Sequence, residues 1–467
     1  MKIKFIGAAR EVTGSKTLIT LDNGKKILLD CGMFQGKGQQ TDAMNRNLGF
    51  EPREIDHIIL THAHIDHSGL IPYVYKLGFR GSVICTNATR DLCAIMLADS
   101  GHIQESDTEM FNKKRARHGL EPVEPIYKKE DAIHCMELFI GTAPGRKFYI
   151  NESIKVRFTN IGHLLGAGAA LIEITENGKV TKIAYTGDIG RPSSHLLKAP
   201  EPFAQCDYLI TEATYGNRLH VQMQTAEEEL LRVVTEACVD RGGKLIIPSF
   251  AIGRTQELVY SLNKFFNDGR LPKVQIYVDS PLAVNATDIF RLHPECFNSD
   301  VLEVIDNDND PFGFNSLHYI KTTDESKRLN FFKKPCVIIS ASGMMEAGRI
   351  KHHLANNISN PRNTILGVGY CAPSTLGARI LRGERLISIF GIQYEVNATI
   401  ERIEAFSGHG DYNEMLSYLG CQDKSQIKKT FLVHGDYDAQ LFYMDKMKEA
   451  GFGEIEIPEA GNEFVLD

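Results

Sequence analysis

Residues 61–69 read Thr-His-Ala-His-Ile-Asp-His-Ser-Gly and directly follow a strand-like apolar run that ends at Leu60. Three histidines and an aspartate this close together are seldom there for packing, because burying such side chains without partners costs free energy. In a tight turn after a strand, His62 and His64 can hold one metal ion while Asp66 and His67 turn toward a second. Imidazole and carboxylate suit zinc, and catalytic zinc sites keep one position open for water. A polar loop with chance histidines would explain one of them, but not the cluster.

The composition is that of a globular protein of two or three domains: 467 residues, 43% hydrophobic and 24% charged. No apolar run is long enough for a membrane span, and the first residues do not form a signal peptide, so we expect a cytoplasmic protein without a membrane partner. The net charge of −7 argues against a surface that coats nucleic acid everywhere, but it allows a local basic groove. The ten cysteines contain no CxxC pair, which indicates reduced, buried thiols.

Alternating short patterns predict a mixed α/β chain. Strand-like runs separated by glycine turns extend to about residue 207, with a helical segment at 86–119 whose Leu92, Ile95, Met96 and Ile103 are expected on one face. Beyond Cys206, apolar strands alternate with helical segments, which is typical of a mostly parallel sheet. After about residue 386 strand pairs return, and residues 303–315 are expected to form a polar loop.

The motif HxHxDH after a strand resembles the signature of the metallo-β-lactamase superfamily, whose fold is an αβ/βα sandwich. Further segments match that family in order. On this resemblance Asp30 in LLDCGMFQG supports the first histidines from behind, and His163 in IGHLLGAG is the third ligand of the first zinc. Asp188 in YTGDIGR is the carboxylate that bridges both metals.

A second set of motifs resembles the β-CASP branch of this superfamily, which includes pre-mRNA cleavage endonucleases, bacterial RNases and DNA-repair nucleases. The set comprises ITEATYGN with Glu212, IIPSFAIGRTQELVYSL, IYVDSPLAVNAT, ISASGMMEAGR, FSGHGDY with His409, and FLVHGD with His434. The resemblance implies that His434 is the last ligand of the second zinc. It also implies an inserted α/β domain at 209–386, between two parts of the lactamase domain at 1–208 and 387–467.

The implied chemistry is hydrolysis of RNA phosphodiester bonds in the cleft between the two domains. Two zinc ions about 3.5–4 Å apart would activate a bridging hydroxide and clamp the phosphate. One zinc is assigned to His62, His64 and His163, the other to Asp66, His67 and His434, with Asp188 shared. Asp66, Asp188, Glu212 and His409 are expected to carry the catalysis.

His409 lies in a glycine-flanked loop, so it is either a phosphate contact or general acid, oriented by Glu212, or a histidine of the core. Ser407 beside it, and the backbone at Ser342 and Gly343, are candidate phosphate-binding positions. The alternative for Ser342 is a helix N-cap and nothing more. Basic residues of the insertion that can line a groove for the strand are Arg254, Arg349, Lys351, Arg379 and Arg382.

RNA, single-stranded rather than duplex, is the expected partner, and a homodimer is compatible with the sequence. A DNA nuclease of the same branch is the main alternative, since the sequence separates RNA from DNA poorly. A small-molecule hydrolase is disfavoured because the inserted domain would roof the metals. A non-catalytic scaffold is disfavoured because such relatives lose metal ligands, whereas all seven are present. Endonucleolytic cutting and 5′ exonucleolytic cutting remain open.

Overall fold

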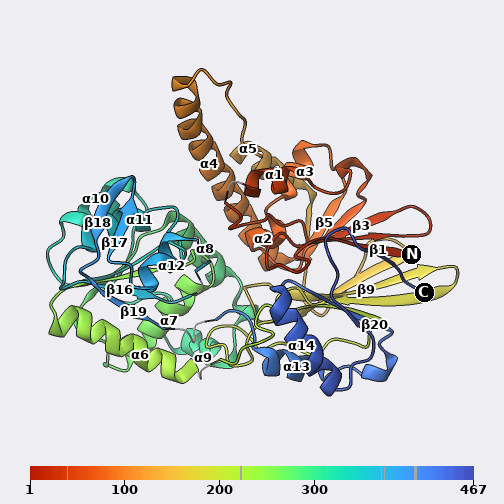
Figure 1. Ribbon diagram of the computed structural model, residues 1–467. Coiled ribbons are helices and arrows are strands. Elements are labelled where there is room, and N and C mark those ends of the chain that lie inside the picture. The colour runs from red at the N-terminus through yellow and green to blue at the C-terminus, as the bar shows by residue number, and fades with distance from the viewer. Residues whose placement is uncertain (39, 221–222, 309, 370, 373, 404–406) are drawn as a thin grey trace. The chain divides into compact units, whose positions relative to one another are not determined.

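The computed structural model describes the chain except residues 39, 221–222, 309, 370, 373 and 404–406 (Figure 1). The chain forms two compact units, each described separately here. The first contains Met1–Pro192, Leu197–Leu219 and His409–Asp467, and the second contains Ser193–Leu196 and His220–Gly408. Since the chain leaves the first unit and later returns to it, the second unit is an insertion.

The first unit is built on two seven-stranded sheets. One has the order β22 (Glu463–Val465), β1 (Lys2–Gly7), β2 (Lys16–Thr20), β3 (Lys26–Leu29), β4 (His57–Ile59), β5 (Ser82–Thr86) and β6 (Phe139–Thr142). The other has the order β21 (Ile455–Glu456), β20 (Lys429–Val433), β11 (Tyr208–Glu212), β10 (Lys179–Tyr185), β9 (Gly168–Glu176), β8 (Ile154–Asn160) and β7 (Lys147–Tyr149). Both sheets change from antiparallel to parallel pairing along their width.

One apolar core joins these two sheets. Ile3 and Phe5 of β1 and Ile59 of β4 belong to the same buried cluster as Phe158 of β8 and Phe431 of β20. Such inward-facing residues alternate with outward-facing ones along each strand, as strands with one buried face require. The helices of this unit are α1 (Gln40–Arg46), α2 (Ile65–Ser68), α3 (Ile71–Lys76), α4 (Asn87–Arg117), α5 (Lys129–Cys135), α13 (Tyr412–Leu419) and α14 (Tyr437–Glu449). In Figure 1, α13 and α14 lie beside β20.

The inserted unit contains the parallel sheet that the sequence predicted. Its order is β14 (Leu317–Tyr319), β13 (Gln275–Val278), β15 (Cys336–Ser340), β12 (Lys244–Pro248), β16 (Thr364–Gly367) and β19 (Thr399–Arg402), and every pairing is parallel. A separate hairpin consists of β17 (Leu386–Ile389) and β18 (Ile392–Glu395). The helices are α6 (Met223–Thr235), α7 (Arg254–Asn267), α8 (Pro281–Leu292), α9 (Ser299–Asp308), α10 (Thr323–Phe331), α11 (Ile350–Asn357) and α12 (Leu376–Leu381).

Apart from Ser193–Leu196, the inserted unit covers His220–Gly408 and so begins and ends later than the range 209–386 expected from the sequence. At its start, β11 pairs with β10 and β20 and so belongs to the first unit. At its end, β19 adds to the parallel sheet beside β16, and the hairpin buries Ile387 and Ile389 in the core of the inserted unit. Strand pairing therefore assigns the segment after residue 386 to the insertion as far as Arg402.

Two local predictions differ from the structure. The helix expected at 86–119 is α4, but only Leu92 and Met96 of its four marked residues are buried, and Ile103 is exposed because that part of the helix lacks a covering layer. The segment 303–315 is not a loop throughout, since α9 continues to Asp308 and buries Val301. Polar composition alone does not exclude an amphipathic helix.

All ten cysteines are free, and eight are buried, as expected; Cys371 is half-buried and Cys421 is exposed. No helix within the described residues has the length and apolar character needed to cross a membrane.

Candidate metal centre

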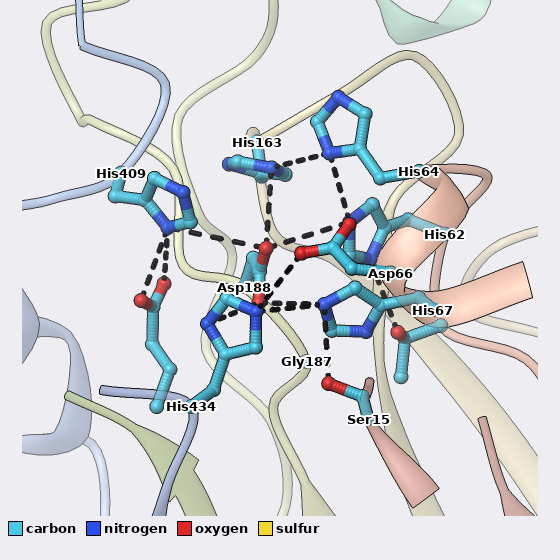
Figure 2. A network of polar contacts seen from close by, with 12 residues as sticks. Ser15, His62, His64, Asp66, His67, His163, Gly187, Asp188, His409 and His434 are labelled. Carbon is cyan, nitrogen blue, oxygen red and sulfur yellow. Dashed lines mark hydrogen bonds and ion pairs between the residues drawn. The ribbon is translucent and has the colours of Figure 1, made fainter. Parts of the chain in front are cut away.

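The predicted ligands follow the ends of strands in the first unit. His62 and His64 come between β4 and α2, while Asp66 and His67 lie within α2. The others follow in turn: His163 after β8, Asp188 after β10, and His434 directly after β20. Because β10, β11 and β20 are parallel neighbours, their carboxyl ends reach the same edge of the sheet. Figure 2 shows these side chains converging on one another.

The first ligand group consists of His62, His64, His163 and Asp188, whose ligand atoms all lie within 4.8 Å of one another. His64 Nδ1 is 3.1 Å from both His62 Nε2 and His163 Nε2. Burial lowers the pKa of His62 and lowers that of His64 to about 4. Neutral imidazoles with facing nitrogen atoms are the form in which histidine binds a metal.

The second group consists of Asp66, His67 and His434. His434 Nε2 lies 3.2 Å from His67 Nε2 and 3.3 Å from Asp66 Oδ2. The two groups match the two ligand sets assigned from the sequence, and the structure brings together all seven predicted ligands.

Asp188 connects the groups and supports the presence of a cation. Its Oδ2 is 3.5 Å from both His62 Nε2 and His163 Nε2, and its Oδ1 is 3.3 Å from His67 Nε2. Oδ1 is buried and accepts no hydrogen bond from any residue that the structure describes. A buried carboxylate oxygen without a donor is costly unless a positive charge compensates it. The donor set therefore fits metal ions on either side of Asp188.

Asp30 supports His67 directly, and it reaches His62, one of the first histidines expected, only through the hydroxyl of Thr61. Its buried Oδ2 accepts from His67 Nδ1 at 2.7 Å, and also from the hydroxyls of Thr61 and Tyr185 at 2.8 and 2.9 Å. With Nδ1–H fixed in this way, His67 presents its Nε2 lone pair to the second group. Gly32 allows this approach, because a Cβ there would lie 1.6 Å from the backbone oxygen of Asp66.

His434 is held in a left-handed backbone conformation, with φ 48°. Its N–H donates to the carbonyl of Ala8 at 2.7 Å, and its ring Nδ1 lies 2.9 Å from the hydroxyl of Thr214. That hydroxyl donates to the His434 carbonyl, so its oxygen is available to accept from Nδ1–H. A positive φ at a residue with a Cβ persists only where the surroundings impose it.

Sequence reasoning missed Thr214, Thr61 and Tyr185. The signal for Thr214 was available, because it lies two residues after Glu212 and alternate residues at a strand end share a side. Tyr185 and Thr61 are adjacent to ligand-bearing loops, but their residue types are common in strands and carry no chemistry of their own.

Glu212 and His409 form a pair beside Asp188. His409 Nδ1 is 3.0 and 3.2 Å from the two carboxylate oxygens of Glu212, and 3.9 Å from Asp188 Oδ2. Glu212 also accepts from the N–H groups of Ile189 and Thr214. Burial lowers the pKa of His409, but the adjacent Glu212 outweighs this effect and raises the pKa to about 9. Glu212 also lies within ligand range of Asp188 and His434, although its oxygens are occupied by these donors.

None of the three predicted phosphate-binding residues is among the metal ligands. Ser342 and Gly343 follow β15 in the inserted unit, and the Ser342 N–H donates to the carbonyl of Ala347 at 3.2 Å. Ser342 is not a helix N-cap either, because α11 begins only at Ile350 and its N-cap is Arg349. Ser407 is half-buried in the segment leading to His409.

Most basic residues expected to line a groove are paired within the inserted unit. Arg254 pairs with Glu257, and Arg349 pairs with buried Asp279 at 2.7 Å. Both Arg379 and Arg382 pair with Glu384, at 2.8 and 3.5 Å. Lys351 instead places its ammonium 5.0 Å from the ring centre of Phe390.

This arrangement of ligands agrees with comparisons to known proteins. Residues 10–214 match the Metallo-beta-lactamase superfamily, residues 255–380 match the Beta-Casp domain, and residues 393–458 match the Zn-dependent metallo-hydrolase RNA specificity domain. The chain belongs to the β-CASP branch of the metallo-β-lactamase superfamily.

Several relatives are similar over most of this chain. A ribonuclease of Thermus thermophilus is 33% identical over 94% of this chain and 94% of its own. An RNase J-like protein of Methanocaldococcus jannaschii is 33% identical over 95% and 94%. The cleavage and polyadenylation specificity factor 73 of Drosophila melanogaster is 30% identical over 93% of this chain and 60% of its own.

Proposed function

We propose that the chain is a ribonuclease that hydrolyses phosphodiester bonds of RNA with two bound zinc ions. The observation that carries this proposal is the buried carboxylate of Asp188 between two separate groups of ligands. Two-metal sites of this kind are suited to phosphate esters. The relatives named as ribonucleases support RNA as the substrate class.

His62, His64 and His163 would hold one ion, Asp66, His67 and His434 the other, and Asp188 would contact both. When bound, such ions supply an activated water at neutral pH and offset the charge of the phosphate. Asp30 and Thr214 keep His67 and His434 in the ring orientation that each ligand position needs. The αβ/βα arrangement is supported by the apolar core that the two sheets share.

His409 is the residue placed to handle the proton of the leaving oxygen. Its Nδ1 donates to Glu212, which holds the ring and stabilises its protonated form. The opposite ring nitrogen, Nε2, is the proposed donor to the substrate oxygen, and a histidine oriented in this way can act as a general acid. Glu212 orients His409 and does not itself contact the substrate.

Single-stranded RNA is the proposed form of the substrate. The homodimer and the cytoplasmic location stay predictions from the sequence.

The test uses end-labelled RNA and DNA of the same sequence, incubated with the zinc-loaded chain, with product lengths read at early times. RNA should be cut and DNA left intact. Asp188→Asn should lose cutting together with bound zinc, because it removes the shared carboxylate charge. Glu173→Gln, an acid of β9 paired with Lys147 rather than with a ligand, is the matched control and should keep both.

The product pattern separates the remaining alternatives. Internal fragments indicate endonucleolytic cutting, and mononucleotides released from the labelled 5′ end indicate stepwise cutting. Cleavage of DNA at the rate of RNA, or the absence of bound metal in an active preparation, would contradict the proposal.

A further inference from the structure

The hairpin of β17 and β18 has an unusual residue in its turn. Ile389 pairs with Ile392, so the turn consists of Phe390 and Gly391 alone. Both have positive φ, 55° and 81°, as a type I′ turn requires. Such turns favour Asn-Gly, because a bulky residue is an outlier in the left-handed region. Phe390 therefore occupies a position that local backbone preference opposes.

Phe390 gains little from burial in return for this conformation. Its side chain is 53% exposed. By contrast, Ile387 and Ile389 of the same hairpin are fully buried and anchor it to the core of the inserted unit. An exposed phenylalanine in a strained turn does not stabilise the fold, and strain of this kind is typical of functional positions.

The neighbours of Phe390 come from α11, near which Figure 1 shows the hairpin. The ring of His352 lies 4.7 Å from that of Phe390, centre to centre, at an interplanar angle of 33°. The ammonium of Lys351 lies 5.0 Å from the centre of the Phe390 ring. His352 is itself exposed and Lys351 is half-buried, so two exposed aromatic rings, one from the hairpin tip and one from α11, lie beside a cation.

Other surfaces of the hairpin are less suited to an apolar partner. Cross-strand pairing places Leu386 opposite Glu395 and Ser388 opposite Gln393, all four exposed. Side chains of directly opposite residues share a face, so this face is mostly polar. The tip from Ser388 to Gln393 carries no acidic residue.

We propose that Phe390, His352 and Lys351 form a stacking platform for single-stranded RNA. A base would stack on the exposed rings, and Lys351 would meet the neighbouring phosphate. Aromatic rings beside a cation are the usual elements of sequence-tolerant binding to single strands. This inference rests on the proposed function for the identity of its ligand, and it adds a binding surface formed by residues other than the metal ligands.

The key variant is Phe390→Asn in the full chain. Asparagine accepts positive φ, so this variant should melt at the same temperature as the parent or higher. Its dissociation constant for a fluorescently labelled single-stranded RNA, measured by anisotropy with chelator present to prevent cutting, should rise about 5- to 100-fold. A gain in stability with a loss of binding is a result that a purely structural role for Phe390 does not produce.

Three further variants serve as controls. Phe390→Tyr retains a ring and should bind like the parent. Phe331→Asn removes another exposed ring, 82% exposed at the end of α10, and should leave binding unchanged. Lys351→Gln should weaken binding and make it less dependent on salt, since one phosphate contact is lost.

Each outcome decides between the alternatives. If the parent cuts RNA and Phe390→Asn binds RNA like the parent, the platform is wrong while the proposed function stands. If Phe390→Asn changes only the sedimentation of the protein, the tip is a protein contact and the inference is wrong. If the parent neither cuts nor binds RNA, both proposals fail.

Discussion

His434 and His409 belong to one buried cluster, yet their contacts differ. His434 Nε2 faces Asp66 and His67 and lies within 3.3 Å of both. His409 instead has Glu212 as its hydrogen-bond partner. The first is placed as a ligand and the second as a proton donor.

We therefore expect different results when each is changed to alanine. His434→Ala should lose about one of two metal ions and the activity, because a ligand is removed. His409→Ala should retain both ions and lose about 10²- to 10⁴-fold in rate, the usual contribution of general acid catalysis. Elemental analysis and single-turnover cutting of RNA measure the two effects. Equal loss of metal in both variants, or a parental rate for His409→Ala, would show that the roles are assigned wrongly.

Asp279 is a buried carboxylate in the inserted unit that accepts from Ser326 and His353 at 2.6 Å and from Arg349 at 2.7 Å. Burial raises the pKa of Asp279, but these three donors outweigh burial and lower the pKa below its usual range. A depressed carboxyl pKa contributes stability that is complete above the unfolded value of about 3.9 and lost as pH falls through the folded value.

Asp279→Asn should therefore reduce the free energy of unfolding by about 3–5 kcal/mol at neutral pH, since it leaves half-buried Arg349 without its partner charge. The difference from the parent should shrink as pH falls from about 4 through the depressed folded pKa of Asp279, because protonation then removes the charge of the parent carboxylate too. Urea unfolding at several pH values measures this. Exposed Glu303→Gln is the control, and a difference for Asp279→Asn that is constant with pH would contradict the argument.

The ligands were predictable because metal chemistry restricts residue types within a short motif, as at His62–His67, and because the family resemblance supplied His163, Asp188 and His434. The residues that orient these ligands were not predictable from the sequence. Thr214 and Tyr185 contribute single hydroxyls, and only the folded backbone brings these to His434 and Asp30. The direct partner of Asp30, His67, was also missed, since a carboxylate next to several histidines can serve any of them.

At the scale of elements, strands were predicted better than the limits of units. The sequence of β1 alternates between apolar and polar residues, and that of β12 is a continuous apolar run, so both strands could be recognised directly. That β19 belongs to the inserted unit depends on its pairing with β16. The two segments are far apart in sequence, so this pairing could not be predicted from the sequence. Helix α9 was hidden for another reason, because its aspartates and asparagines are common in loops.

The N-cap of helix α13, Asp411, lies two residues after His409 and forms a capping box. Asp411 Oδ1 accepts from the N–H groups of Asn413 and Glu414 at 2.9 and 3.0 Å, and Glu414 accepts from the Asp411 N–H at 3.0 Å. Glu414 also pairs with Arg191. This cap fixes the start of the helix and, through it, the end of the loop that carries His409.

Asp411→Ala should lower the free energy of unfolding by about 0.5–2 kcal/mol. It should also slow cutting while both metals stay bound, because the His409 loop loses its attachment. Asp411→Ser retains an acceptor and should recover most of both losses. Chemical unfolding, metal content and turnover provide the comparison, and a serine variant as impaired as the alanine variant would refute the cap as the cause.

At the scale of the whole molecule, every assigned ligand belongs to the first unit. Its core, which includes Phe5 and Phe431, is separate from that of the inserted unit, which includes Ile338 and Leu354. Bound metal stabilises only the structure to which it binds.

Calorimetry should therefore show one transition that moves to lower temperature with excess chelator and another that does not move. Hydrogen exchange assigns each transition to a unit. After chelation we expect faster exchange in β8 and β20 of the first unit and unchanged exchange in β12 and β15 of the inserted unit. Restoring zinc should reverse the effect. An equal shift of both transitions would mean that the units unfold together.

The ligands His67 and His434 meet although 367 positions separate them in the chain. Synthesis on the ribosome proceeds from the N-terminus, so the second ligand group is incomplete until the strand that ends at Val433 has left the exit tunnel and paired beside β11. The last strand, β22, then closes the sheet against β1. Metal binding at the second ligand group must therefore follow the synthesis of the strand that ends at Val433.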